Sequence, residues 1–142
     1  MDKNEALLQE IYKNVKMGSD SIINLMDRVG DDGLRREMKD ELITYRQLAA
    51  EATDRLGERG LKPQELPASA KVGAKIGMAF NTMLDTSASH LAEMMINGST
   101  MGIIEMEKKL NDAPDCPQTT RNLASRVVEF EKASAEKLTK FL

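Results

Sequence analysis

Two glutamates of this chain stand in helix-like stretches at a spacing known from metal chemistry. Glu41 precedes Thr44 by three residues, and Glu131 precedes Ser134 by three residues. In helical bundles the pattern Glu-x-x-His puts a carboxylate and an imidazole on one helix face. Two such patterns and two further glutamates bind a pair of iron or manganese ions. Here both histidine places are filled by hydroxyl residues, and the chain has one histidine, His90. One histidine cannot complete two patterns, so we expect no complete dinuclear site within one chain.

A site built from oxygen ligands alone is the remaining metal hypothesis. Glu41, Glu105 and Glu131 would supply the carboxylates, and Tyr45 follows Glu41 by one helical turn. Oxygen ligands of this kind favour magnesium, manganese or calcium over iron. We therefore keep these three glutamates as metal candidates, although we expect no cofactor.

Glu41 itself has two interpretations. It forms a buried polar pair with Tyr45 or lines a ligand cavity, or it lies at the edge of the apolar helix face. At that edge its carboxylate would reach water or an arginine such as Arg46 or Arg126. We prefer the second interpretation, because unpaired carboxylates are rarely buried.

Methionine is unusually common, with ten in the chain. Six of them fall in its second half, where they would make a soft copper(I) site, an adaptable binding surface, or simply core packing at helical spacing. We prefer core packing. The six are Met78, Met83, Met94, Met95, Met101 and Met106.

The elements that carry these residues are predicted to be helices. Apolar residues recur at the helical period through long stretches without proline, and strand-like alternation is almost missing, so the fold class is all-α. A Gly-Asp-Asp-Gly turn joins the first two helices into an antiparallel hairpin. A connector with two prolines and an extra helix would then cross to a second hairpin, which is the layout of a four-helix bundle with one long crossover. We predict one domain with helices at about 4–29, 33–59, 68–84, 87–111 and 118–141.

The extra helix has a competing interpretation. One unbroken helix over 69–111 would be ~64 Å long at 1.5 Å per residue, which is too long for this domain unless it is kinked.

The last two predicted helices carry a resemblance to a known family. "MINGSTMGIIEMEKKL" at 95–110 and "VVEFEKASAEKLTKFL" at 127–142 resemble the final helices of an uncharacterised bacterial branch of the ferritin-like superfamily. The resemblance covers nearly the whole chain through spacing and layout. It implies a four-helix bundle and, in the family, often iron or oxygen chemistry. The chain departs from the family at both histidine positions and at the first-helix glutamate, so the family's metal ligands are not carried over.

The bulk composition limits the class of partner. A length of 142 residues suits one compact domain, and 41% hydrophobic with 30% charged residues favours a folded, soluble chain. The formal net charge of −3 gives no basic patch for nucleic acid. A single cysteine permits no disulfide within the chain, and no run of ~18 apolar residues suggests a transmembrane segment. We expect a cytoplasmic protein.

The segment 68–104 is poor in charge, with only Lys71, Lys75, Asp85 and Glu93. Its glycines give up helix propensity, and close contact with another helix would compensate for that loss. We predict an interface at Gly73, Gly77 and Phe80. The preferred function is a non-enzymatic bundle that acts as an assembly or protein-binding module, with a homodimer as the simplest case. The alternative is a metal- or small-ligand-binding protein with an atypical carboxylate site.

Overall fold

The computed structural model describes residues 2–65 and 84–142. These residues form helices and no strand, as the sequence predicts. The helices are α1 (Lys3–Met26), α2 (Asp32–Glu58), α4 (Ala88–Asp112) and α5 (Gln118–Leu138), followed by a short 3-10 turn, η1 (Thr139–Phe141).

Two predictions fall outside the described residues. They are the interface at Gly73, Gly77 and Phe80, and the helix at 68–84, of which only residue 84 is described. Residues 84–87 are not helical, and the Ser87 hydroxyl accepts the backbone N–H of His90 at 3.2 Å. That cap starts α4 as a separate helix, so one continuous helix over 69–111 is excluded.

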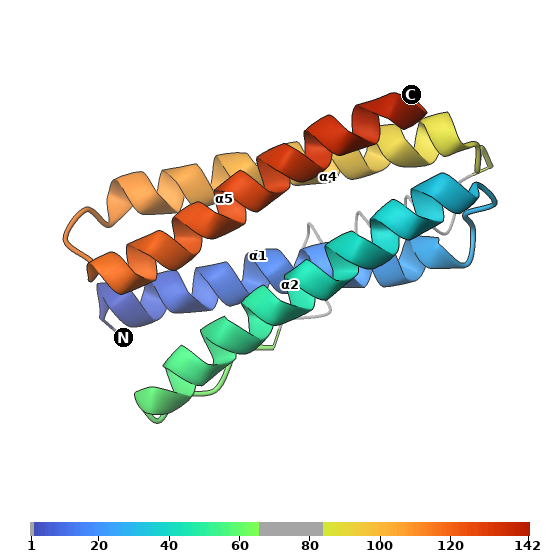
Figure 1. The fold of residues 1–142 in the computed structure, drawn as a ribbon. Helices are drawn as coiled ribbons and strands as arrows, with labels where there is room; N and C mark the ends of the chain where they lie inside the picture. The colour runs from blue at the N-terminus through green and yellow to red at the C-terminus, as the bar shows by residue number, and fades with distance from the viewer. Residues whose placement is uncertain (1, 66–83) are drawn as a thin grey trace.

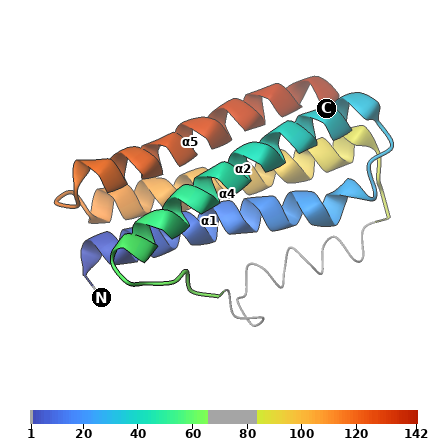
Figure 2. The ribbon, with the colours of Figure 1, turned by 60° about the horizontal axis from the view of Figure 1, so that its bottom comes forward.

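The four helices pack as two antiparallel hairpins, α1 with α2 and α4 with α5 (Figure 1). Helix α1 also packs against α4, and α5 also packs against α2, so α2 and α4 lie diagonally. Both views show α2 and α4 running in the same direction (Figures 1 and 2). The end of α2 and the start of α4 therefore lie at opposite ends of the bundle (Figure 1).

Local sequence signals explain where the helices begin and end. Asp2 and Glu5 form a capping box at the start of α1, and the Asp31 carboxylate accepts the Leu34 N–H at 2.8 Å at the start of α2. Helix α1 ends at Met26, three residues before the predicted end at 29. Val29 is buried although it lies outside the helix. Its apolar side chain fits the helical period, which is why the predicted end lies beyond the C-terminus of α1.

The core is largely apolar, with a polar cluster near its middle and the buried Gln9 and Thr120 toward the N-terminal ends of α1 and α5. Leucine, isoleucine and valine side chains from all four helices fill the ends, where Leu8, Leu34, Leu91 and Leu138 are fully buried. The middle instead holds Ser19, Glu41, Tyr45, Ser99, Glu131 and Ser134, all buried. No helix in the described part of the chain is long and apolar enough to span a membrane.

Candidate functional site: a polar cluster under a groove

The central polar cluster is built on α2 and α5. Glu41, Tyr45 and Glu131 are only 3%, 4% and 2% exposed. The Tyr45 hydroxyl donates a hydrogen bond to Glu131 Oε2 at 3.0 Å, and the Tyr45 ring meets Phe130 edge to face at 4.8 Å. These contacts fix Tyr45 and Glu131 against each other across the α2–α5 interface.

The preferred interpretation of Glu41 as an edge carboxylate is wrong. Its side chain points into the bundle, and Arg126 pairs with Glu51 at 2.8 Å instead. The hydroxyl of Ser134 from α5 lies beside Glu41 and favours its charged form. The serine of the Glu131–Ser134 pattern therefore interacts with Glu41 on the neighbouring helix.

Two glycines make room for this cluster. A Cβ atom on Gly18 of α1 would lie 2.5 Å from Tyr45 Cε1, and a Cβ atom on Gly102 of α4 would lie 2.5 Å from Glu131 Oε2. Both distances are far below van der Waals contact, so a side chain at either position would displace Tyr45 or Glu131. Glycine weakens a helix by about 1 kcal/mol relative to alanine. At Gly18 and Gly102 that loss is offset by the space that Tyr45 and Glu131 occupy.

Asn14 connects the cluster to α1 and α4. Its Nδ2 donates to the carbonyl oxygen of Gly102 at 3.0 Å, and its side chain lies beside the Glu131 carboxyl, whose charged form it favours. Three buried side-chain oxygen atoms have no hydrogen-bond partner among the described residues: Asn14 Oδ1, Glu41 Oε2 and Glu131 Oε1. Such atoms are rare in folded proteins and call for a partner.

Burial keeps both central carboxyls neutral. It raises the pKa of Glu41 to about 8, with the nearby Glu37 carboxylate acting in the same direction and Ser134 and Lys137 acting against it. Burial also raises the pKa of Glu131 to about 8, although the Tyr45 hydroxyl and Asn14 partly oppose this. The pKa of Tyr45 is raised well above its usual range by burial and by Glu131. At pH 7 both acids therefore carry a proton.

A groove between α1 and α4 opens onto the cluster. It has a volume of about 570 Å³, and Glu41, Tyr45, Glu131 and Asn14 contribute to its lining. At its outer part Lys109 faces Glu10 at 3.9 Å. The apolar side chains lining the groove are Met17, Ile22, Leu25, Met94, Met95, Met101 and Met106.

The three metal candidates line this one groove but do not form a ligand cluster. Glu41 and Glu131 are buried, whereas Glu105 is exposed. Within residues 2–65 and 84–142, no group of three or more histidine, cysteine, aspartate or glutamate side chains is placed to hold a metal ion. The oxygen-ligand metal site therefore stays a hypothesis, with two of its members in the core and one at the surface.

Four of the six methionines singled out in the sequence line the groove. Met106 is fully buried, as core packing predicts, but Met94 and Met95 are half-buried and Met101 is 50% exposed. Asn14 and Ser99 are site residues that sequence reasoning missed. The glycines inside predicted helices were the available signal, because they mark where a large side chain of another helix enters.

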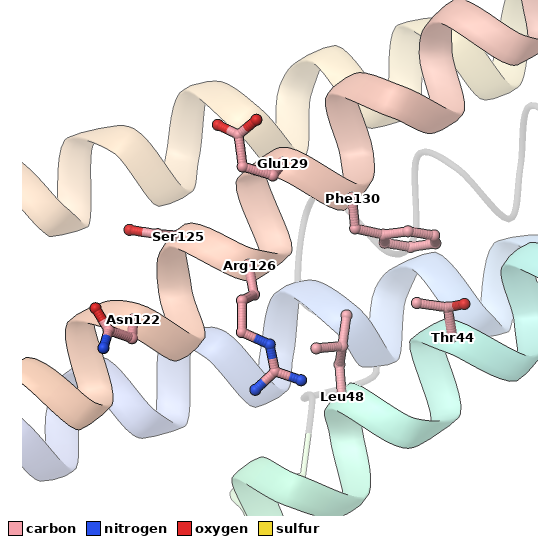
Figure 3. A pocket seen from close by; sticks show the side chains of 7 residues that line it. All are labelled: Thr44, Leu48, Asn122, Ser125, Arg126, Glu129 and Phe130. Carbon is pink, nitrogen blue, oxygen red and sulfur yellow. The ribbon is translucent and has the colours of Figure 1, made fainter.

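A second hollow of about 610 Å³ lies on the opposite interface, between α2 and α5. Figure 3 shows Arg126 and Phe130 of α5 directed toward Leu48 and Thr44 of α2. Thr44 lines this outer hollow, away from the groove that Glu41 lines. The Arg126 guanidinium is held by Glu51, and none of the lining side chains has a buried polar atom without a partner. The α1–α4 groove is thus the stronger candidate site.

The fold and the groove define the chain as an all-helical bundle with a polar centre that opens to the surface. No protein-family model matches the chain, and no curated protein matches it. Among solved structures, a DUF305 fragment from Deinococcus radiodurans is similar with a TM-score of 0.77 and 14% sequence identity. The similarity covers 99% of this chain and 95% of that one. At this identity the likeness establishes the fold alone.

Proposed function

We propose that this protein binds a small ligand in the α1–α4 groove, above the cluster of Glu41, Tyr45 and Glu131. The observation that carries the proposal is the set of three buried side-chain oxygen atoms without partners, on residues that line the groove. A buried polar atom left unpaired costs about 1–3 kcal/mol. A ligand that donates hydrogen bonds to these atoms would recover part of that cost.

The shape and lining of the groove support the same proposal. Its volume of about 570 Å³ lies within the ~300–1,000 Å³ that small-molecule sites usually have. Seven methionine and aliphatic side chains line it, together with the buried polar cluster and with charged side chains such as Glu10 and Lys109 at its outer part. Methionine side chains are flexible and adapt to the shape of an apolar ligand.

The ferritin-like assignment is part of this proposal. Helices α2 and α4 run in the same direction (Figure 1), which requires one long crossover, as in ferritin-like bundles. The ligand would also occupy the centre of the bundle, where such proteins place their sites. A metal held by Glu41, Glu105 and Glu131 is less well supported, because these carboxylates form no ligand group in the described part of the chain.

A set of three probes with the same six-carbon chain tests the proposal. Hexylammonium, 1-hexanol and hexanoate would be titrated into protein labelled with ¹³C at the methionine methyl groups, up to about 10 mM, the weak end of useful affinity. We expect at least one probe to shift the methyl signals of Met17, Met94 and Met106. The signal of Met38, which is buried away from the groove lining, is the internal control. If no probe shifts the groove methionines, the proposal is wrong.

Self-association is a second candidate function. Met101 and Ile104 of α4 are 50% and 48% exposed, and Met101 also lines the groove. Exposed apolar side chains of this kind favour a homodimer or a protein partner. Light scattering on a sized fraction tests this candidate, and a monomer mass that stays constant on concentration would contradict a homodimer.

A further inference from the structure

We propose that the groove selects a primary alkyl ammonium, whose head group binds Glu131 and Asn14 and whose chain lies along the groove methionines. This inference rests on the proposed function and names its ligand class. The proposed ligand is defined by its chemistry: it is a cation that carries several N–H donors and is attached to an aliphatic chain.

The geometry at Glu131 and Asn14 favours a donor with more than one hydrogen. Glu131 Oε2 is occupied by the Tyr45 hydroxyl, and Asn14 Nδ2 is occupied by the Gly102 carbonyl oxygen. These two bonds hold both side chains in place and leave Glu131 Oε1 and Asn14 Oδ1 as oxygen atoms without partners. Both are acceptors once Glu131 has lost its proton. An ammonium group carries three donors and no acceptor, so one head group can satisfy both atoms. A carboxylate ligand brings only acceptors, so it would leave Asn14 Oδ1 unpaired and its negative charge would oppose ionisation of Glu131.

The charges around the groove favour a cation as well. Helix α1 contributes Glu10 and Lys13, α4 contributes Glu105 and Lys109, and α2 and α5 each contribute one buried carboxyl. Lys109 faces Glu10 at 3.9 Å, so its charge is partly balanced. Outside the lining, the Glu37 carboxylate raises the pKa of Glu41 and Lys137 lowers it. Four carboxyl groups against two lysines make the lining acidic once a buried carboxyl ionises.

Binding would exchange a proton for the ligand. In the free protein Glu131 is neutral at pH 7, because burial raises its pKa to about 8. When the ammonium group arrives, its positive charge stabilises the ionised carboxylate, and the proton of Glu131 leaves to the solvent. The ligand keeps its own proton throughout, so each ammonium bound releases up to one proton from the protein.

The three chain-matched probes test the ligand class directly. We expect hexylammonium to bind more tightly than 1-hexanol, and hexanoate to bind most weakly, as read from the shifts of the groove methionine methyl groups. Calorimetry at pH 7 in two buffers of different ionisation enthalpy should show proton release on hexylammonium binding and none on hexanol binding. Titration with Mn²⁺ on the same sample tests a metal ion as the competing cation.

Glu131→Gln is the informative variant, because glutamine resembles the neutral acid in shape and in having one donor and one acceptor end. The variant should keep the fold, which its methyl spectrum and thermal midpoint would verify. Its affinity for hexylammonium should fall about tenfold or more, the range for one charge-assisted hydrogen bond. Glu105→Gln is the matched control, since Glu105 lines the same groove but is exposed, and its effect should be small.

Three results would overturn the ammonium assignment. They are equal or tighter binding of 1-hexanol, an unchanged preference for hexylammonium in Glu131→Gln, and tighter binding of Mn²⁺ than of hexylammonium at the same methyl groups. Each of these leaves a ligand in the groove and so leaves the proposed function intact. If no probe shifts the groove methionines, both proposals fail together.

Discussion

Replacing Glu131 with glutamine should weaken the pH dependence of the protein's stability. The pKa of Glu131 is raised from 4.5 to about 8 in the folded state. Between these two values the folded protein holds a proton that the unfolded chain has released. The stabilisation from this group is therefore fully present below pH 4.5 and is lost as the pH rises toward 8.

The size of the effect follows from the two pKa values. Between pH 5.5 and pH 7.5 the free energy of unfolding should fall by about 2.5 kcal/mol for each such carboxyl, close to the limiting slope of about 1.4 kcal/mol per pH unit. Glu41 has a similarly raised pKa of about 8 and contributes a comparable amount. Glu131→Gln removes one of the two contributions, so the loss between the two pH values should be smaller by about 2.5 kcal/mol.

Urea unfolding followed by circular dichroism at pH 5.5 and 7.5 measures both free energies. Glu129→Gln is the matched control on the same helix, because Glu129 is mostly exposed and pairs loosely with Lys132 at 3.7 Å. It should leave the wild-type pH dependence nearly unchanged. An identical pH dependence in wild type and Glu131→Gln would refute the reasoning, since it would mean that Glu131 is ionised in the folded protein at neutral pH.

Three further predictions test the space and hydrogen bonds around the cluster. Gly102→Ala should destabilise the fold by about 1–3 kcal/mol through overpacking against Glu131. Gly98→Ala should instead stabilise it by about 0.5–1 kcal/mol, because nothing lies within 4 Å of the added Cβ. Thermal unfolding of both variants measures the two effects, and equal effects would contradict the prediction. Tyr45→Phe should cost about 1–2 kcal/mol at pH 5.5, measured by urea unfolding, because it leaves Glu131 Oε2 without its 3.0 Å donor. The double variant Tyr45→Phe with Glu131→Met should be at least as stable as wild type at pH 7.5 and should no longer bind hexylammonium, while a large loss of stability would show that the polar pair is structural.

The helical architecture could be predicted because it depends on local signals. Asp31 before α2 and Ser87 before α4 are short-range caps, and the apolar period of each helix is visible within a few turns. The end of α1 was placed too late for an equally local reason. Val29 is buried from a turn, and periodicity does not distinguish a turn residue that packs inward from one more helical residue.

The candidate site was only partly predictable, because its residues depend on contacts between helices. Glu41 was assigned to the surface on the general rarity of buried carboxylates. Its carboxyl lies beside Ser134 of α5, and Gly18 of α1 leaves room for the neighbouring Tyr45, so its surroundings come from three other residues on different helices. Gly98 and Gly102 are four residues apart on α4 and look equivalent in sequence. Only Gly102 faces Glu131, and that distinction exists only once α4 and α5 are packed together.

The cluster lowers the stability of the fold, and packing alone does not explain why it is there. Two acids are held neutral in the core, and three buried side-chain oxygen atoms lack partners. Apolar side chains of similar volume would fill the same space, and such replacements are often neutral or stabilising. Both glycines that admit the cluster also weaken their helices. Residues that lower stability in a core are expected where a site has a function. The same residues line the groove, so a donor-bearing ligand there accounts for both the unpartnered oxygen atoms and the glycines that leave room for the cluster.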